Sequence, residues 1–404
     1  MDDGLTRKDS LTWSGRALAA AAIAAGGAAR CAPAWSAEAG APSGAGGEPA
    51  GPGGPPGKAG GPPPAPLVME RRTIELALRH TWTIARNSST VKNNVLVRVE
   101  GGGLACLGEA APNARYQEDW QGVLAALGRI APLLGDDPGR FAEVIDRVHA
   151  AVPAAHAATA AVDIALHDLA GRRAGRPLWR MLGADAARMP LTSFSIGIDT
   201  IPAMQEKVRE AAGYPILKIK VGRDDDRAIL EGIRAVTDKP LYVDANEGWK
   251  DRAQAVAMIR WMEGMGVVLV EQPMSAADLD SARFIRDHVA LPIIADEAVL
   301  SEADIAPLAG ACDGINIKLQ KAGGLRMARR MIDRARALGL KVMLGCMIET
   351  SVGITAAAHL APLCDWADLD GNLLITNDPF RGVTVEAGRL VLPTGPGLGV
   401  EGTW

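Results

Sequence analysis

Leu217-Lys218-Ile219-Lys220-Val221 is the first of a series of short apolar segments that end in charged residues. The later segments of the series end as follows: Asp244-Ala245-Asn246, Glu271-Gln272-Pro273, Asp296-Glu297 and Lys318-Leu319-Gln320-Lys321. Successive charged ends lie 22 to 27 residues apart, which leaves room for one strand and one returning helix. Repeating βα units of this length predict parallel strands that are joined by crossover helices.

Further candidate strands on either side bring the number to about eight, the count of a closed (β/α) barrel of the triosephosphate isomerase type. The candidates are residues 193–196, 217–221, 241–244, 267–271, 293–296, 314–319, 341–345 and 366–370. The competing architecture is an open doubly wound sheet, which usually carries a glycine-rich phosphate turn after its first strand, and this sequence has no such turn. In a barrel, the charged strand ends are expected to meet at one rim.

The predicted barrel domain, residues 189–375, follows a segment in which the apolar residues are spaced differently. Apolar residues at the start of residues 67–188 have strand-like spacing, and those further along have helical spacing, most regularly at residues 157–171. This pattern predicts an α+β domain. We call it the capping domain. Residues 376–404 are expected to return to it.

The first 66 residues differ from this body in composition. Residues 40–66 contain 10 glycines, 9 prolines and no bulky hydrophobic residue, so they predict a disordered linker. Residues 1–39 have the three parts of a signal peptide, with Arg7 and Lys8 in a polar start, then an apolar run and small residues. Residues 6–11 resemble a twin-arginine export motif with lysine in place of the second arginine. We expect export to the periplasm, with a cytoplasmic protein as the alternative.

The overall composition excludes several classes of protein. A formal net charge of −4 and a pI near 5.9 argue against a nucleic-acid partner. The apolar run near the N-terminus is too short for a spanning helix, so stable membrane insertion is not expected. The five cysteines contain no C-x-x-C pair, which disfavours a disulfide framework or a structural zinc site.

Asp244, Glu271 and Asp296 end three successive predicted strands. Three hard oxygen ligands, with room left for water and substrate oxygens, suit octahedral Mg²⁺. Without a cation, these carboxylates would repel one another and raise one another's pKa. Zinc is disfavoured because no histidine or cysteine accompanies them at the strand ends.

Lysines flank this predicted metal site. Lys218 and Lys220 point to the same face of one strand, and Lys318, four strands further round, should face Lys220 across the barrel mouth. A lysine near another ammonium and a divalent cation loses part of its affinity for the proton and can act as a base. Two such lysines predict removal of a proton next to a carboxylate on one face and its return on the other, through an enediolate. Lys321 is interpreted as a neighbouring helix-start or rim charge outside this set.

These motifs together resemble the enolase superfamily, and within it the muconate cycloisomerase-like branch. The segments that carry the resemblance are K-I-K at 218–220, D-A-N at 244–246, E-Q-P at 271–273, A-D-E at 295–297 and N-I-K-L-Q-K-A-G-G at 316–324. Residues 165–171, followed by Gly175 and Pro177, are similar to the helical signature that precedes the barrel in this branch. The resemblance implies a (β/α) barrel with an N-terminal α+β capping domain.

The resemblance also implies roles for individual residues. Asp244, Glu271 and Asp296 would bind Mg²⁺, and Lys220 and Lys318 would be the catalytic acid/base pair. Substrate-binding residues would be Lys218, Asp368, Asp370, Arg86, Glu349 and Met347, with Glu349 as the contact to the substrate carboxylate, and Asn246 and Glu297 would surround the metal ligands.

Asp368-Leu369-Asp370 narrows the choice of reaction. Two carboxylates on one face of a strand resemble the D-x-D of dipeptide epimerases, which binds the free α-ammonium of the substrate. A turn or helix-cap element is the alternative. Residues 83–89 resemble the specificity loop of this family, in which Arg86 would pair with a side-chain carboxylate, as in L-Ala-L/D-Glu from cell-wall peptide.

The predicted function is therefore a Mg²⁺-dependent dipeptide epimerase that inverts the α-carbon of the C-terminal residue. The alternative enzyme is an N-acylamino acid racemase or a cycloisomerase of the same superfamily. The non-enzyme alternative, an inactive barrel that acts as a binding protein, is disfavoured because all three carboxylates and both lysines are present. Expected partners are a small dipeptide substrate and further copies of the chain in a homo-oligomer.

Overall fold

The computed structural model describes residues 66–404, and the account below concerns these residues. The predicted signal peptide and the predicted linker up to residue 65 lie outside the described residues. Among the described residues, no helix has the length and apolar character needed to cross a membrane.

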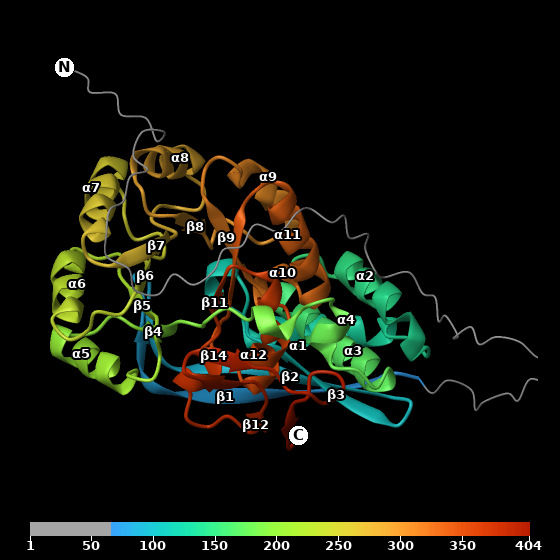
Figure 1. Cartoon of the computed structure of the whole chain (residues 1–404). Helices are drawn as coiled ribbons and strands as arrows, with labels where there is room; N and C mark the ends of the chain where they lie inside the picture. Colours follow the sequence, from blue (N-terminus) through green and yellow to red (C-terminus); the bar gives the residue numbers. More distant parts are fainter. Residues whose placement is uncertain (1–65) are drawn as a thin grey trace, which may run out of the picture. The chain divides into compact units, whose positions relative to one another are not determined.

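An eight-stranded parallel sheet forms the barrel (Figure 1), with its strands hydrogen-bonded in sequence order. The strands are β4 (Phe194–Ile196), β5 (Leu217–Lys220), β6 (Leu241–Asp244), β7 (Val267–Glu271), β8 (Ile293–Ala295), β9 (Gly314–Lys318), β10 (Lys341–Gly345) and β11 (Trp366–Asp368). A parallel bridge between Thr192 and Ala367 joins the segment before β4 to β11, so the first and last strands meet. The predicted fold class is confirmed.

The strand register brings the charged strand ends to one level. Lys220 pairs with Asp244, and Asp244 pairs with Glu271 on the next strand. Except for Val268 of β7, which is exposed, the apolar residues of β5, β6 and β7 before these ends are buried, because parallel strands in a barrel are covered on both faces. Asp296 lies one residue beyond β8, where the chain leaves the sheet, so its carboxylate belongs to a strand-to-helix turn.

Helices cover the outside of the barrel (Figure 1). They are α5 (Ile201–Glu210), α6 (Asp226–Arg234), α7 (Arg252–Glu263), α8 (Leu279–His288), α9 (Ile305–Leu308), α11 (Leu325–Ala337) and α12 (Ser351–Ala358), and the short α10 (Leu319–Ala322) lies between β9 and α11. In α6, Ile229, Leu230 and Ile233 are buried at helical spacing and join the main hydrophobic core. α10 is a single short turn that directly follows Lys318, the last residue of β9.

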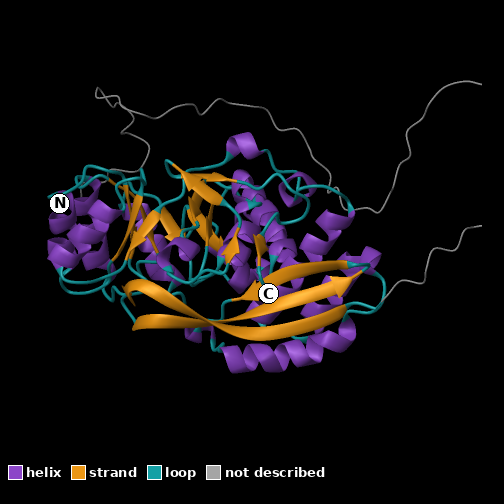
Figure 2. Cartoon of the chain, turned by 90° about the horizontal axis from the view of Figure 1, so that it is seen from below, coloured by secondary structure: helices purple, strands orange, loops and turns teal. Residues whose placement is uncertain are grey.

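The capping domain is a three-stranded antiparallel sheet with helices, which Figure 2 shows below the barrel strands. Its elements are β1 (Val68–Thr83), β2 (Ser88–Gly101), β3 (Leu104–Ala110), α1 (Trp120–Ile130), α2 (Phe141–Ala151), α3 (His156–Arg173) and α4 (Leu178–Met181). β3 packs tightly on α3, since a Cβ atom at Gly108 would lie 1.8 Å from the carbonyl oxygen of Ala161. This close approach explains why the position holds glycine.

The C-terminal residues contact the capping domain after the barrel ends. The backbone N–H of Thr376 donates to Ala77 of β1 at 2.9 Å, and that of Leu398 donates to Asp168 of α3 at 2.8 Å. Two short antiparallel strand pairs complete the segment: β12 (Phe380–Arg381) pairs with β15 (Glu401–Gly402), and β13 (Thr384–Glu386) pairs with β14 (Arg389–Val391).

Candidate active site

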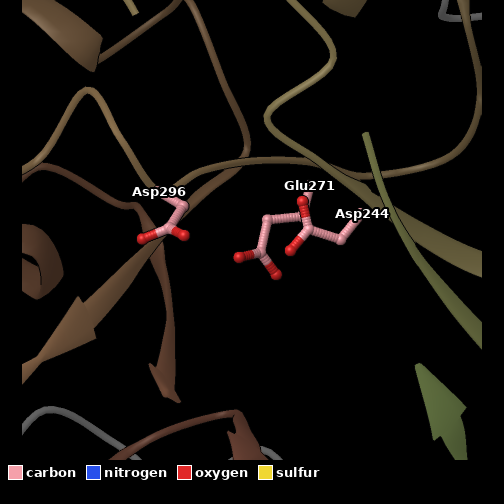
Figure 3. Close-up of side chains that lie close together, drawn as sticks. All are labelled: Asp244, Glu271 and Asp296. Atoms are coloured by element: carbon pink, nitrogen blue, oxygen red, sulfur yellow. The ribbon is translucent and has the colours of Figure 1, made fainter. Parts of the chain in front are cut away.

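Three buried carboxylates form the centre of the site. Asp244, Glu271 and Asp296 each offer a ligand oxygen, and these oxygens lie within 4.8 Å of one another. Figure 3 shows the three side chains reaching into one space from different strand ends. The side chains of Asp244 and Glu271 are completely buried and Asp296 is 1% exposed, so water does not screen their mutual repulsion.

The triad fits a divalent cation. Lys218 Nζ lies 2.8 Å from Glu271 Oε2, but the contact lacks hydrogen-bond alignment, so this buried oxygen receives no hydrogen bond. Burial raises the pKa of Glu271 to about 8, and the charges of Asp244 and Asp296 add to the shift although Lys218 opposes it. An unsatisfied hard oxygen between two further carboxylates is the donor set that Mg²⁺ prefers. Mg²⁺ is the cofactor that this site accommodates.

Lys218 lies beneath the triad. Its side chain is 0% exposed, and its Nζ lies 2.7 Å from Asp368 Oδ2 and 3.3 Å from Asp244 Oδ2. Burial disfavours the ammonium, but the carboxylates of Asp368, Glu271 and Asp244 hold its pKa well above the ordinary value. Lys218 is therefore a fixed positive charge under the cavity and does not line it.

Lys220 and Lys318 line the cavity above the triad, on β5 and β9. Lys220 Nζ lies 2.6 Å from Asp244 Oδ2, and Lys318 Nζ lies 2.9 Å from Asp296 Oδ2. Burial disfavours the charged form of Lys318, but the Asp296 carboxylate holds its pKa well above the ordinary value. The lowered pKa expected for Lys318 from the sequence therefore requires a bound cation that shares the Asp296 carboxylate.

Of the two positions expected for Lys321, the start of the next helix is confirmed, because Lys321 lies in α10, and the rim charge is wrong. Its side chain is buried, its Nζ donates to the Asp296 carbonyl oxygen at 2.6 Å and to that of Asn316 at 3.0 Å, and it forms an ion pair with the Asp296 carboxylate. The short helix α10 turns the chain back under the site and carries Lys321 with it. The sequence signal was a second lysine three residues after Lys318, which is about one helical turn.

Asn246 and Glu297 lie beside the metal triad, as expected. The Asn246 backbone N–H donates to Asp244 Oδ1 at 2.9 Å, and its side-chain amide donates to Glu297 Oε1 at 3.1 Å. Arg86 closes this group from the capping domain: its guanidinium donates to Glu297 Oε1 at 2.8 Å and to the Asn246 carbonyl at 2.7 Å. Arg86 is thus at the cavity wall, but protein carboxylates already engage it. A contact with a substrate carboxylate stays a prediction.

A second arginine holds the capping domain to the barrel rim, and the sequence analysis missed it. Arg115 donates through two nitrogens to Glu247, at 2.8 and 2.9 Å. Arg86 donates to the same carboxylate at 3.2 Å. The three residues are far apart in the sequence and belong to no recognisable motif, so no local signal could have found the cluster.

Asp368 and Asp370 both line the cavity. Asp368 Oδ1 accepts from the Ser193 hydroxyl at 2.7 Å, and Asp370 Oδ2 accepts from the Ser195 backbone N–H at 2.6 Å. Burial raises the pKa of Asp370 to about 7, and the neighbouring Asp368 contributes to the shift. These serines, which the sequence analysis did not select, reach the pair because β4 and β11 meet where the barrel closes.

Met347 lines the cavity, whereas Glu349 does not. The Glu349 carboxylate is buried and accepts from the backbone N–H of Met347 and from the side chain of Gln320, each at 2.8 Å. Burial raises its pKa to about 8, and the nearby Glu109 adds to the shift. This geometry offers no direct contact between Glu349 and a substrate, because the turn into α12 directs the side chain inward.

The cavity itself lies between the two domains. Its wall from the capping domain contains Trp82, Ile84, Arg86, Lys92 and Tyr116, and its floor is the C-terminal rim of the barrel strands. A capped (β/α) barrel with buried carboxylates and two opposed lysines at this rim defines a metal-dependent enzyme class that moves a proton beside a carboxylate.

Comparison with known proteins gives the family. Residues 69–183 match the mandelate racemase / muconate lactonizing enzyme N-terminal domain, and residues 203–403 match the enolase C-terminal domain-like family. The chain belongs to the mandelate racemase / muconate lactonizing enzyme family of the enolase superfamily.

Three relatives illustrate the similarity. The L-Ala-D/L-Glu epimerase of Bacteroides thetaiotaomicron is 45% identical over 327 residues, which cover 81% of this chain and 85% of the relative. A substrate-liganded L-Ala-D/L-Glu epimerase from Bacillus subtilis superimposes with a TM-score of 0.80 at 32% identity, covering 84% of this chain and 99% of that one. A dipeptide epimerase from Enterococcus faecalis, complexed with Mg and L-Leu-L-Tyr, gives a TM-score of 0.78 at 33% identity, covering 83% and 99%.

Mg²⁺ binding is expected to release a proton. Glu271 has a pKa of about 8 without a cation, so it is largely protonated at neutral pH and must ionise to bind the metal. Mg²⁺ affinity should therefore rise with pH, by up to about tenfold per pH unit, and level off above about pH 8. Isothermal titration calorimetry in buffers of different ionisation enthalpy measures both the Mg²⁺ affinity and the number of protons released. An affinity that does not change between about pH 6 and pH 8 would contradict this expectation.

Proposed function

We propose that this protein is a Mg²⁺-dependent dipeptide epimerase that inverts the α-carbon of the C-terminal residue by a two-base 1,1-proton transfer. One observation carries the proposal: a single cavity brings together Lys220 and Lys318 from strands on opposite sides of the barrel and the carboxylate pair Asp368 and Asp370. The lysines provide the proton chemistry, and the pair provides a site for a free amino terminus. Three relatives named for dipeptide epimerisation support it.

The positions of the charged groups orient the substrate. Its terminal carboxylate would lie at the triad of β6, β7 and the turn after β8, and its ammonium would lie at Asp368 and Asp370 near β11. The α-carbon of the C-terminal residue then lies between Lys220 and Lys318. A bound Mg²⁺, held by Asp244, Glu271 and Asp296, would stabilise the negative charge that develops on the substrate carboxylate.

The two lysines divide the proton transfer. One Nζ accepts the α-proton from its own face of the substrate, and the other Nζ donates a proton to the opposite face, which inverts the centre. Lys218 and Lys321 touch the same carboxylates from below and have no access to the cavity. Burial disfavours ionised Asp244 and Asp296, but nearby lysines, including Lys218 for both and Lys321 for Asp296, hold the pKa of each below its ordinary value and keep these two carboxylates ionised.

The C-terminal residue of the substrate is the part nearest Arg86. We propose an acidic side chain there, as in L-Ala-L-Glu, because Arg86 lies at the cavity wall next to Glu297 on the metal side. A guanidinium can bind a further carboxylate through a second nitrogen pair. Such dipeptides arise from cell-wall peptide, which would place the enzyme in cell-wall peptide metabolism.

Proton exchange tests the two-base mechanism. With Mg²⁺ in D₂O, L-Ala-L-Glu should exchange its C-terminal α-proton, with deuterium mainly in the inverted product. Lys220→Ala and Lys318→Ala should each lose epimerisation by on the order of 10²–10⁴-fold. Each variant should still exchange the one epimer whose α-proton faces the remaining lysine, as followed by NMR.

Lys341→Ala is the matched control, because Lys341 is an exposed lysine at the opposite end of a barrel strand. It should retain wild-type exchange. Absence of exchange with every dipeptide in the wild-type protein would rule out the proposed function.

The carboxylate pair separates this function from an N-acylamino acid racemase. An ammonium needs ionised Asp370, whose pKa is about 7, so kcat/KM for free dipeptides should fall as the pH drops below about 7. Asp370→Asn should lower kcat/KM for free dipeptides by about tenfold or more, as expected for the loss of a charge-assisted hydrogen bond. It should leave kcat/KM for N-acetylated dipeptides unchanged. A wild-type preference for the acetylated form would favour the racemase.

We also propose export, which rests on the signal-like pattern of residues 1–39. Cleavage would be expected after these residues, so mass spectrometry of the protein from its native host should find a mature N-terminus near residue 40. Replacement of Arg7 and Lys8 by glutamine should retain the precursor in the cytoplasm. A native protein that begins at Met1 would refute export.

A further inference from the structure

Four cationic side chains line the cavity, and one of them differs from the rest. Arg86, Lys220 and Lys318 each contact a carboxylate, that of Glu297, Asp244 or Asp296, at 2.6–2.9 Å. Lys92, on β2, also lines the cavity and is half-buried. Among the described residues, no hydrogen bond or ion pair is found for its ammonium group.

This arrangement leaves Lys92 without compensation for lost hydration. Burial lowers its pKa, and no neighbouring carboxylate opposes the shift, in contrast to Lys218 and Lys318. A partly desolvated ammonium that faces a substrate cavity is stabilised when an anionic group binds there. The missing partner is therefore expected on the substrate.

Contacts of β2 place Lys92 on one side of the cavity. Lys92 pairs with Leu76 in the antiparallel ladder, so the two side chains share a face with Asn94, two residues further along. Asn94 donates to the Ile348 carbonyl at 3.0 Å, and Leu76 packs against Ile348 and Ile375. This face lies over the segments that follow β10 and β11.

Arg86, the second cationic residue of the capping domain that lines the cavity, lies on the opposite side of the cavity. Its partners Asn246, Glu247 and Glu297 follow β6 and β8, next to the triad residues Asp244 and Asp296. Arg86 is thus near the substrate carboxylate end. Lys92 lies over the segments after β10 and β11, which is the side of the cavity that also holds Asp370, where the free ammonium of the substrate would lie.

We propose that Lys92 binds an anionic side chain on the N-terminal residue of the dipeptide, so that dipeptides with glutamate or aspartate in the first position are substrates. The inference rests on the proposed function, because it uses the orientation given there. Lys92 then determines specificity at the first residue and has no part in proton transfer.

Matched dipeptides test the assignment. With Mg²⁺, the wild-type protein should show a kcat/KM for L-Glu-L-Ala about tenfold above that for the neutral isostere L-Gln-L-Ala, the effect of one charge-assisted hydrogen bond. Lys92→Met should abolish this preference, so that the ratio of the two kcat/KM values falls from about ten to about one. Lys92→Arg, which keeps the charge, should retain the preference.

Two controls keep the result interpretable. Arg98→Met removes a cation of the same strand that pairs with Glu70 outside the cavity, and it should preserve the preference. Activity on L-Ala-L-Ala serves as the internal measure of folding for every variant. The inference fails and the proposed function stands if the wild-type protein epimerises L-Ala-L-Glu but has the same kcat/KM for L-Glu-L-Ala and L-Gln-L-Ala. The same conclusion follows if Lys92→Met lowers kcat/KM for all substrates equally. If no dipeptide exchanges its α-proton, both fail.

Discussion

Mutual repulsion among Asp244, Glu271 and Asp296 is the constraint around which the site is organised. Their ligand oxygens lie within 4.8 Å of one another in a region that water does not reach. Such a cluster is stable only if positive charge surrounds it. Lys218 and Lys321 supply that charge from below, and Lys220 and Lys318 supply it at the mouth. A bound Mg²⁺ would complete the balance and free the two upper lysines for proton transfer.

The same electrostatic balance extends outward and holds the capping domain in place. Glu297 and Glu247, next to the triad, are paired with Arg86 and Arg115 of the capping domain. These ion pairs cross from one domain to the other, so the groups that surround the metal site also close the cavity above it. Lys92 is the exception in this pattern, because its charge has no counterpart within the described part of the chain. We therefore infer that the counterpart of Lys92 is an anionic group of the substrate.

Strand-end residues were predictable from sequence because barrel topology constrains them strongly. Once parallel strands repeat at regular spacing, residues at their C-terminal ends must share one rim, and the register pairs Lys220 with Asp244 and Asp244 with Glu271. Residues outside the strands follow no such rule. Lys321 was expected at a helix start or on the rim, and only the structure shows that the single helical turn after β9 buries it against Asp296. Glu349 turns inward for a similar reason. Arg115 and Ser193 escaped notice because their partners are distant in the sequence.

The sequence by itself determined the order of strands and helices, the family resemblance, and the chemical identity of the metal, lysine and paired-carboxylate groups. Periodicity and spacing encode these features locally, since a strand end is marked by a few adjacent residues. Only the tertiary structure decided which charges are neutralised. Pairing between Arg86 and Glu297, burial of Lys218 and the absence of a carboxylate near Lys92 are properties of the folded chain, because electrostatic energy depends on distance and desolvation and not on position along the sequence.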